Sequence, residues 1–467
     1  MDGSDRENRG VDEWVDSVSA EVARYLVAYP ETEYIDAFTF DLCGAPMGKR
    51  CLVSEAGKIY SDGLALCAAA LLLDAGGNTC DPMGFGVSDG DPDAVAWPVF
   101  GTLGPIPWSN GQGAQVLLEM RYPNTDRALP YDPRQILRSV VARFESLAMI
   151  PVVAIELEFY LVDLARGDHG EPLPVKSPVH ARRATRTQVY SIEALEEYSG
   201  VLNAITEACR QQGVPAYIAS GEFAPGQFEI NVRHVSDAVL AADHACLLKR
   251  TVSAVARQFG MDATFLSKPF ADHSGSGLHV HMSFLNNDGV NIFDERIDAD
   301  ERLIRQAIAG LQTGMAESMA IFAPNFNAFR RFIPGQFVPV TKDWGYDNRS
   351  VAFRIPSGRG QSRRIEHRVA GADANPYLVL ASVLASVHHG LTHELAPMSA
   401  PFVGNASVTV DPALPLTLWD ALDVLSQADL LDGYFGASNV TIYKTVKQNE
   451  MHALLSVPSP REYDWYL

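Results

Sequence analysis

The amino-acid sequence predicts an α+β protein whose larger part is built on an antiparallel sheet. Segments that alternate apolar and polar residues are mixed with long amphipathic segments, and their order is not the regular βαβ series of a doubly wound fold. The composition also changes at Tyr122, where Pro123, Pro130 and Pro133 mark a linker. These observations predict a small sheet domain followed by a larger domain.

Composition and charge narrow the class of protein. With 467 residues, 47% of them hydrophobic, the chain can bury a large core. The formal net charge of -20 argues against nucleic acid or an anionic membrane as partner, because both require a basic face. No apolar run reaches the roughly 18 residues that span a bilayer, and the acidic N-terminus is unlike a secretory signal. Six cysteines without a CxxC pair indicate a reducing cytoplasm.

Residues 1–29 form the first predicted unit, a helical leader. Within it, residues 11–29 place apolar side chains at helical spacing, and Pro30 ends the helix. Residues 30–122 form the second unit, the small sheet domain. Its predicted strands are residues 34–42, residues 47–53 as the second arm of a hairpin, and residues 117–121 after an irregular stretch rich in glycine and proline.

Residues 123–467 form the third unit, in which strands and helices are mixed. Asp132 supplies an N-cap and Pro133 the first position of the first helix. The alternating segments predict strands at residues 152–162, 228–234 and 279–284. The amphipathic segments predict helices at residues 192–212, 237–259, 303–322 and 376–394.

Two pairs of carboxylates stand out in the third unit. Glu156 and Glu158 are two residues apart in an apolar strand, so they face the same way. Like charges placed side by side in such a strand are costly unless a cation lies between them, although a Glu-x-Glu pair by itself is weak evidence. Glu222 and Glu229 flank Pro225-Gly226, a natural turn centre, so they can lie on opposing arms of a hairpin.

A third segment adds nitrogen ligands to this pattern. His279, His281 and Ser283 share one face of a predicted strand, and apolar residues take the other face. A lone strand histidine is more often a core residue than a ligand, but here the same alternation recurs in four segments. Ligands rich in oxygen, with little nitrogen and no sulfur, favour Mg²⁺ or Mn²⁺ over zinc.

The fourth segment, residues 329–368, holds nine Lys/Arg against three Asp/Glu in a chain that is otherwise strongly acidic. Alternation places Arg364, Glu366 and Arg368 on one face of its last strand. Guanidiniums interrupted by one carboxylate suit a phosphate chain with a divalent cation beside it. The alternative is a solvated basic strand with ordinary surface ion pairs. Metals beside an arginine row would indicate phosphoryl transfer.

These motifs together resemble the glutamine synthetase family. They are Glu156-x-Glu158, the run from Glu222 to Glu229, Lys268-Pro-Phe followed by the run from Gly275 to Ser283, Asn348-Arg-Ser, and the run from Arg364 to Tyr377. They occur in family order over nearly the whole chain after the leader. The resemblance implies a β-grasp-like N-terminal domain packed on a catalytic domain with a curved antiparallel sheet flanked by helices. It also implies an active site between neighbouring subunits of a ring, in a dodecamer of two hexamers.

The resemblance also implies roles for individual residues. It implies at least two Mg²⁺ or Mn²⁺ ions, one held by Glu158, Glu222 and Glu229 and the other by Glu156, His279 and Glu366. ATP would be bound by His281, Ser283, Arg349 and Arg354. Glutamate would be bound by Gly275, Arg331 and Arg368, and the transferred phosphoryl group would be held by Arg349 and Arg368 as catalytic residues.

Two departures from the family pattern concern the ammonium site. Phe337 stands where ammonia-using members carry a glutamate, and the N-terminal Asp-Gly-Ser-Ser motif has only Asp62-Gly-Leu-Ala as its nearest counterpart. The pattern instead resembles the γ-glutamylpolyamine and γ-glutamylputrescine synthetase branch, in which glutamate is joined to a small amine. Phe337 and Asp62 are therefore the candidate lining of an amine site. A true glutamine synthetase that uses ammonia, or a catalytically inactive structural relative, are the alternatives.

Overall fold

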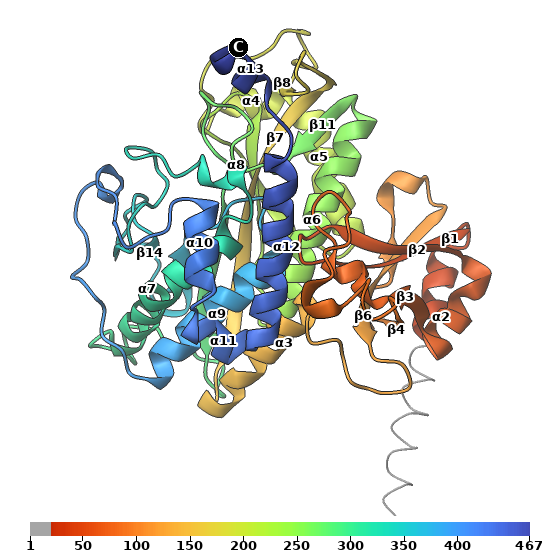
Figure 1. The fold of residues 1–467 in the computed structure, drawn as a ribbon, viewed down its shortest axis with the longest axis horizontal. Helices are drawn as coiled ribbons and strands as arrows, with labels where there is room; N and C mark the ends of the chain where they lie inside the picture. Colours follow the sequence, from red (N-terminus) through yellow and green to blue (C-terminus); the bar gives the residue numbers. More distant parts are fainter. Residues whose placement is uncertain (1–19) are drawn as a thin grey trace, which may run out of the picture.

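The computed structural model describes residues 20–467, which form two sheets with helices packed around them (Figure 1). The long strand β7 (Ile150–Arg166) runs through the middle of the molecule, with helix α12 (Ala437–Leu455) in front of it. The small domain, in red and orange, lies to the right of α12. Residues 20–28 are helical, as predicted, and the rest of the predicted leader lies outside the described residues.

The small domain contains a sheet in the order β2-β1-β6-β4-β3, with β5 paired to β6. β1 and β2 form the predicted antiparallel hairpin, and Phe38 lies opposite Gly48 in its register. β1 and β6 run parallel, so this sheet is mixed. Its elements are β1 (Tyr34–Phe40), β2 (Pro46–Leu52), α2 (Ala56–Asp62), β3 (Leu64–Cys67), β4 (Asp93–Pro98), β5 (Gly104–Pro105) and β6 (Gly113–Arg121).

The larger domain is built on a sheet in the order β13-β14-β15-β12-β7-β10-β9, to which β8 and β11 add pairs with β7. All of its pairs are antiparallel except β13 with β14. β7 alternates between buried and half-buried residues over its first half, which is the pattern of a strand with one packed face. The other strands are β8 (Pro172–Pro174), β9 (Ala216–Gly221), β10 (Gln227–Val232), β11 (Met261–Thr264), β12 (Leu278–Leu285), β13 (Trp344–Tyr346), β14 (Phe353–Ile355) and β15 (Ile365–His367).

Helices cover the packed face of this sheet. α9 is buried almost all round because its sequence is apolar on every face, and it packs closely along α7. Asp132 accepts a hydrogen bond from the backbone of Arg134, which confirms the predicted cap. The helices are α3 (Pro133–Ala142), α4 (Ile192–Glu197), α5 (Ser199–Gln211), α6 (Ala238–Gln258), α7 (Arg302–Phe322), α8 (Phe326–Phe329), α9 (Pro376–Thr392), α10 (Leu418–Leu425), α11 (Asp429–Phe435), α12 and α13 (Pro460–Tyr466).

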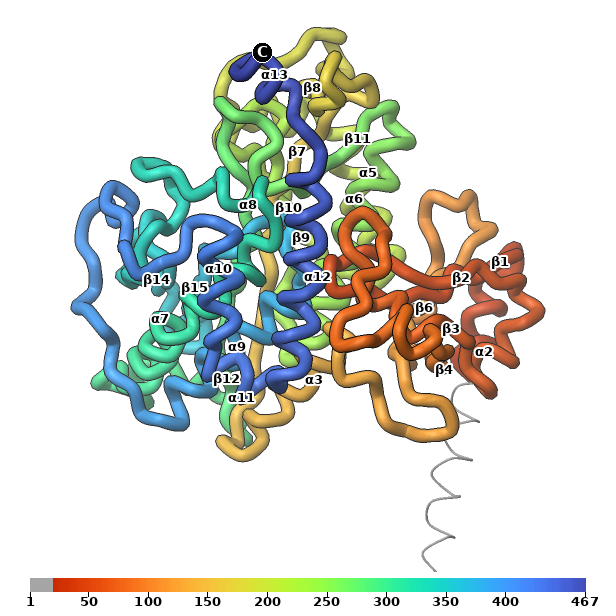
Figure 2. Tube along the Cα trace, viewed as in Figure 1, coloured from red at the N-terminus to blue at the C-terminus, as the bar shows by residue number. Residues whose placement is uncertain are grey.

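The two domains share one continuous hydrophobic core. Figure 2 shows the trace of the small domain next to that of α12, which contacts residues 68–72 and 82–84. At their junction, the ring of Phe40 lies against that of Tyr377, with ring centroids 6.1 Å apart. Asn375 caps α9 and also donates a hydrogen bond to the carbonyl of Asp41 in the β1–β2 turn, at 2.9 Å. The small domain is therefore attached to the chain segment that follows β15.

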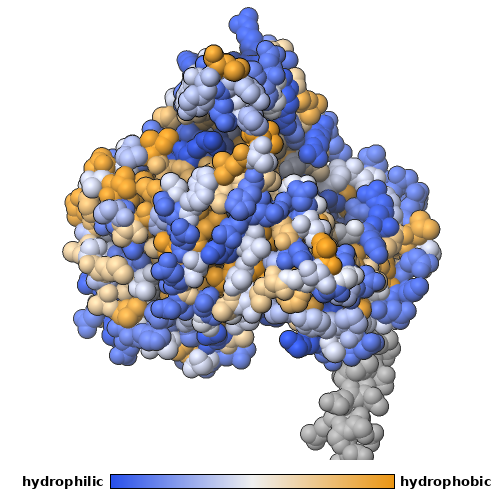
Figure 3. Space-filling view, viewed as in Figure 1, coloured by the Kyte–Doolittle hydropathy of each residue, from blue (hydrophilic) through white to orange (hydrophobic). Residues whose placement is uncertain are grey.

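The predicted α+β class, with an antiparallel sheet flanked by helices, is confirmed. Within residues 20–467, no helix is both long and apolar enough to cross a membrane. Figure 3 shows hydrophilic side chains over much of the small domain and hydrophobic ones gathered on the left of the same face.

The contact between α7 and α9 yields a prediction about stability. A Cβ atom on Gly310 would lie 2.0 Å from the backbone oxygen of Ser386, so one of the two helices must move. We expect Gly310→Ala to destabilise the protein by about 3 kcal/mol, measured as a loss of unfolding free energy in urea. Gly433 of α11 is the matched control, because a Cβ there meets nothing within 4 Å. Gly433→Ala should be neutral or stabilise by up to about 1 kcal/mol.

Candidate active site

Strand register brings the predicted site residues together on one face of the large sheet. β7 lies between β12 and β10, so Glu156 stands opposite His279 on one side and Asn231 on the other. Glu158 stands opposite Glu229. Further along, β15 pairs with β12 and places Glu366 opposite His281. Residues up to 210 positions apart in sequence thus form one row, because an antiparallel ladder sets neighbours about 5 Å apart.

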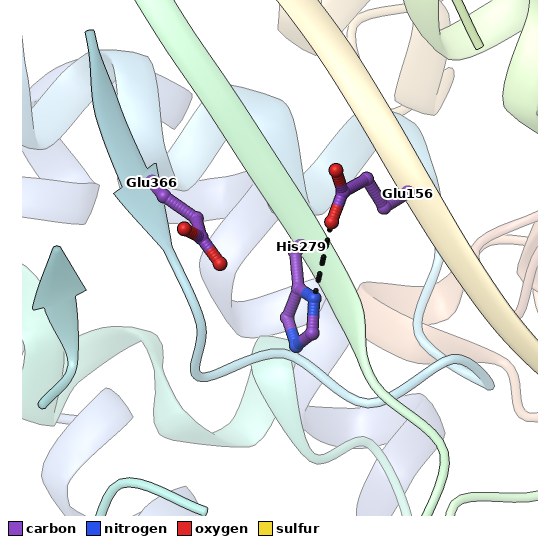
Figure 4. A group of neighbouring side chains, drawn as sticks. All are labelled: Glu156, His279 and Glu366. Carbon is purple, nitrogen blue, oxygen red and sulfur yellow. Dashed lines mark ion pairs between the residues drawn. The ribbon is translucent and has the colours of Figure 1, made fainter. Parts of the chain in front are cut away.

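One candidate metal group consists of Glu156, His279 and Glu366. Each offers a ligand atom, and these atoms all lie within 4.8 Å of one another. Nδ1 of His279 is 3.5 Å from Oε2 of Glu156. Figure 4 shows the three side chains converging from three different strands. This is the same set that the resemblance implies for one of the two ions.

A second candidate group shares His279 with the first and adds Glu158 and Glu229, again with ligand atoms within 4.8 Å. The resemblance implies Glu222 in this set, but among the described residues Glu222 is not part of either group. It lies nearby on the predicted hairpin, where its backbone N–H donates to Gln227 and Gly226 adopts a positive φ of 73°. The assignment of Glu222 as a ligand therefore stays a prediction.

The carboxyl groups of the site repel one another strongly. Burial and the negative charges of Glu156 and Glu158 raise the pKa of Glu229 to about 8, and the same causes raise that of Glu222 to about 8. Burial also acts on Glu156, but hydrogen bonds from His279 and His281 hold its pKa well below its usual range. Without metal, protonation of Glu229 and Glu222 relieves this repulsion at neutral pH, and a divalent cation held between the carboxylates would relieve it in place of the protons. The donor set therefore fits Mg²⁺ or Mn²⁺.

Arginines flank Glu366 on both sides. Its carboxylate accepts a hydrogen bond from Nη1 of Arg354 at 2.6 Å and another from Arg368. Burial favours the neutral acid, yet the positive charge of Arg368 and its neighbours lowers the pKa of Glu366 to about 2. Arg354 also donates to Asp347 at 2.5 Å. Arg349 lies exposed in the segment between β13 and β14.

A cavity of about 920 Å³ opens beside the metal groups. Glu156, His281 and Ser283 line it, so the structure places both predicted nucleotide-binding residues of β12 next to a candidate metal ligand. Nε2 of His281 is 2.9 Å from Glu156, and Nδ1 accepts a hydrogen bond from Arg364 at 3.0 Å. Arg364 also lines the cavity. The sequence placed it on the same strand face as Glu366 and indicated phosphate binding for that face, but assigned Arg364 no role of its own.

Arg331 and Gly275, which are predicted to bind the substrate glutamate, lie at the other end of the row. Arg331 is 4% exposed, and no carboxylate of residues 20–467 forms an ion pair with its guanidinium. Burial lowers its pKa to about 10. A Cβ on Gly275 would lie 2.5 Å from Cγ of Arg331, so the close approach of this loop requires glycine. Arg331 is thus a buried cation whose charge could be balanced by a bound anion.

The two predicted amine-site residues are not brought together within one chain. Phe337 is 70% exposed, in the segment after α8. Asp62 is exposed at the end of α2 in the small domain, which Figure 1 places on the right of the molecule, whereas Phe337 belongs to the segment between α8 and β13 of the larger domain. The assignment of these two residues stays a prediction.

Comparisons with known proteins agree with this geometry. The family described as "Glutamine synthetase, catalytic domain" matches residues 130–466. The γ-glutamylputrescine synthetase PuuA of Escherichia coli is 39% identical, over 96% of this chain and 94% of that protein. A glutamate–isopropylamine ligase of Pseudomonas sp. is 31% identical over 84% and 85% of the two chains. The solved ADP complex of GmaS superposes with a TM-score of 0.80 at 25% identity, covering 95% of this chain and 99% of that one.

The raised pKa values predict how stability depends on pH. Without metal, the native Glu229 and Glu222 keep their protons up to pH about 8, whereas the unfolded chain releases them near pH 4.5. Native protein therefore binds more protons between these values, and its stability falls as the pH rises from 5 to 8. We expect Mg²⁺ or Mn²⁺ to raise the melting temperature more at pH 8 than at pH 6, because ligands must lose their protons to bind.

The control for this experiment is Glu229→Gln, which removes one of the repelling charges. The variant should melt at a higher temperature than the unmodified protein in metal-free buffer at pH 8, and should gain less from added Mn²⁺. An equal response of both proteins to pH and to Mn²⁺ would contradict the electrostatic account of the site.

Proposed function

This chain belongs to the glutamine synthetase family and is a ligase, and from this premise we propose that it joins the γ-carboxylate of glutamate to a small amine at the expense of ATP. The observation that carries the proposal is the single row of ligands across β10, β7, β12 and β15. It has carboxylates and histidine at its centre, a nucleotide-sized cavity at His281, and at its other end Arg331, which has no ion-pair partner among residues 20–467.

The residues of this row would divide the reaction between binding and charge stabilisation. His281 and Ser283 would contact ATP in the cavity, where Arg364 holds His281 in place. Arg331 and the close-packed Gly275 would bind glutamate so that its γ-carboxylate faces the terminal phosphate. When bound, two divalent ions would neutralise phosphate charge, and the six predicted ligands would hold them.

Group transfer would then proceed in two steps. The glutamate γ-carboxylate attacks the γ-phosphorus of ATP, releasing ADP and forming γ-glutamyl phosphate. The amine nitrogen attacks the activated carbonyl carbon, phosphate leaves, and the nitrogen loses a proton. Arg349, Arg354 and Arg368 are the candidates for holding the charge that develops on the phosphoryl oxygens. Arg354 and Arg368 now bind Glu366, so they lie at the edge of the metal group where such oxygens would arrive.

The choice of an amine over ammonia rests on Phe337 and on the relatives. A glutamate at this position would attract NH₄⁺ and take up its proton, and an aromatic ring does neither. An alkylamine loses less, because each methylene packed on apolar surface contributes about 0.8 kcal/mol. Two of the relatives are named for alkyl amines, putrescine and isopropylamine. An inactive relative is disfavoured because all six predicted metal ligands are present in the chain.

Self-association and location belong to the same proposal. A site that borrows Asp62 from a neighbouring small domain requires an oligomer, for which a ring-shaped assembly is proposed. Exposed apolar side chains in two segments would be available to neighbouring subunits: Met398, Val403 and Val408 after α9, and Trp465 and Tyr466 in α13. All six cysteines are free thiols, which supports a cytoplasmic location.

The acceptor assignment predicts a preference among amines. With ATP, glutamate and Mg²⁺ fixed, kcat/KM for butylamine-sized monoamines or diamines should exceed that for ammonium by one to two orders of magnitude, from roughly 2 to 3 kcal/mol of methylene burial. Phosphate release measures both values of kcat/KM. Phe337→Glu should lower the ratio of kcat/KM for the amine to that for ammonium, because it should raise kcat/KM for ammonium. Phe337→Leu is the uncharged control, and the ratio should stay unchanged in this variant. Equal use of ammonium and the best amine by the unmodified enzyme would identify a glutamine synthetase.

Assembly is tested separately. Light scattering on the purified full-length chain should give the mass of a large homo-oligomer, and mixing two inactive variants should restore activity if neighbouring subunits share a site. Asp62→Ala and Glu158→Ala are suitable partners, since they would damage different halves of a shared site. A monomer with full activity would contradict the ring.

A further inference from the structure

Arg331 reaches the site from a segment that other loops must hold in place. Its guanidinium is buried, its Nε has no hydrogen-bond partner, and Nη2 donates only to the carbonyl of Val369. The short helix α8 precedes it, and Gly275 packs directly on its side chain. Three loops therefore meet at Arg331, namely residues 267–277, 325–331 and 369–375.

Asp373 links these three loops through one carboxylate. Its Oδ1 accepts from Oγ of Ser267 at 2.6 Å, and its Oδ2 accepts from the backbone N–H of the same residue at 3.3 Å. Oδ2 also accepts from Nδ2 of Asn325 at 2.9 Å. Ser267 begins the loop that carries Gly275, and Asn325 caps α8 just before Arg331. Asp373 itself follows Arg368, so each loop with a predicted glutamate-binding residue is attached to it.

The packing around Asp373 leaves little room for another arrangement. A Cβ on Gly371 would lie 2.0 Å from Oγ of Ser267 and 2.8 Å from Oδ1 of Asp373, so the contact between the two side chains requires glycine there. Ser267 O accepts the backbone N–H of Ser276 at 2.8 Å, next to Gly275. Displacement of Ser267 would therefore be transmitted directly to the wall that faces Arg331.

Asp373 also supplies negative charge that acts on two cations, Arg331 and Lys249. Burial lowers the pKa of Arg331, and the negative charges of Glu158 and Asp373 partly offset this by raising it. The same carboxylate acts on Lys249, which is half-buried in α6 and donates to the carbonyl of Ala372 at 2.9 Å. Asp373 forms no ion pair within 4.0 Å with either cation among the described residues, so it balances Arg331 without occupying its guanidinium.

We propose that Asp373 is a positioning residue for the amino-acid end of the site, holding Arg331 and the Gly275 loop in the geometry that binds the substrate carboxylate. The inference rests on the proposed glutamate–amine ligase function. It predicts that Asp373 sets the affinity for glutamate and has little influence on the nucleotide cavity, which lies beyond β12 and shares none of these three loops.

The test compares Asp373→Ala and Asp373→Asn with the unmodified full-length enzyme. We expect Asp373→Ala to raise KM for glutamate roughly tenfold to a hundredfold, because the variant loses a charged hydrogen-bond acceptor. KM for ATP should stay within about threefold of the unmodified value. Asp373→Asn keeps one acceptor oxygen, so its KM for glutamate should lie between those of the unmodified enzyme and Asp373→Ala. Melting temperature gives a measurement independent of turnover. The rise in melting temperature on adding glutamate with Mg²⁺ and a non-hydrolysable ATP analogue should be largest for the unmodified enzyme, smaller for Asp373→Asn and smallest for Asp373→Ala.

Asp74→Asn is the control, because Asp74 of the small domain is also an aspartate that accepts hydrogen bonds from several donors, namely the backbone of Gly76 and Asn78 and the side chain of Asn449 in α12. It should leave both KM values within about twofold. If Asp373→Ala does not fold, Ser267→Ala removes a single donor and should still raise KM for glutamate alone.

If the unmodified enzyme is active and Asp373→Ala changes KM for glutamate and KM for ATP equally, or changes neither, the inference is overturned. An unmodified enzyme without any glutamate-dependent phosphate release would overturn the proposed function as well.

Discussion

The cost of placing carboxylates side by side governs the architecture of this protein. Glu156, Glu158 and Glu229 lie on adjacent strands at the centre of the large sheet, with Glu222 beside them, and burial makes their repulsion stronger than it would be in water. The sheet tolerates this arrangement because histidines of β12, Arg354 of β14, and Arg364 and Arg368 on either side of β15 enter the same face. Carboxylate oxygens are the ligands that hard cations prefer, so the carboxylates on this face are candidate metal ligands.

The same face arranges the steps of the proposed reaction in space. One end opens into the cavity beside His281, the middle holds the candidate metal groups, and the other end closes on Arg331. Because the ligands project from paired strands, their spacing is set by the ladder and not by flexible loops. The glutamate end differs, since loops carry Arg331 and Gly275, and a further carboxylate at Asp373 is needed to hold them.

The relatives and the structure address different parts of the function. The family match and the solved relatives identify the fold and the class of ligase. The acceptor is a question of a few residues outside the sheet, of which Phe337 is exposed and Asp62 lies in the small domain. Specificity for an amine would therefore depend on how two subunits meet, and the chemistry of the row would be the same for any acceptor.

Much of this protein was determined by its sequence alone. The two-residue period of residues 152–162 and 279–284 predicted both strands and the polar face they share, because a strand's side chains alternate whatever its partners are. Asp132 and Asn375 begin helices through local hydrogen bonds that need no tertiary contact. Periodicity could not show which strands pair, since register depends on contacts between segments far apart in the chain. Only the tertiary structure decided that His279 serves both metal groups, that Glu366 is held between Arg354 and Arg368, and that Asp373 joins three loops, because each of these depends on distances across the folded chain.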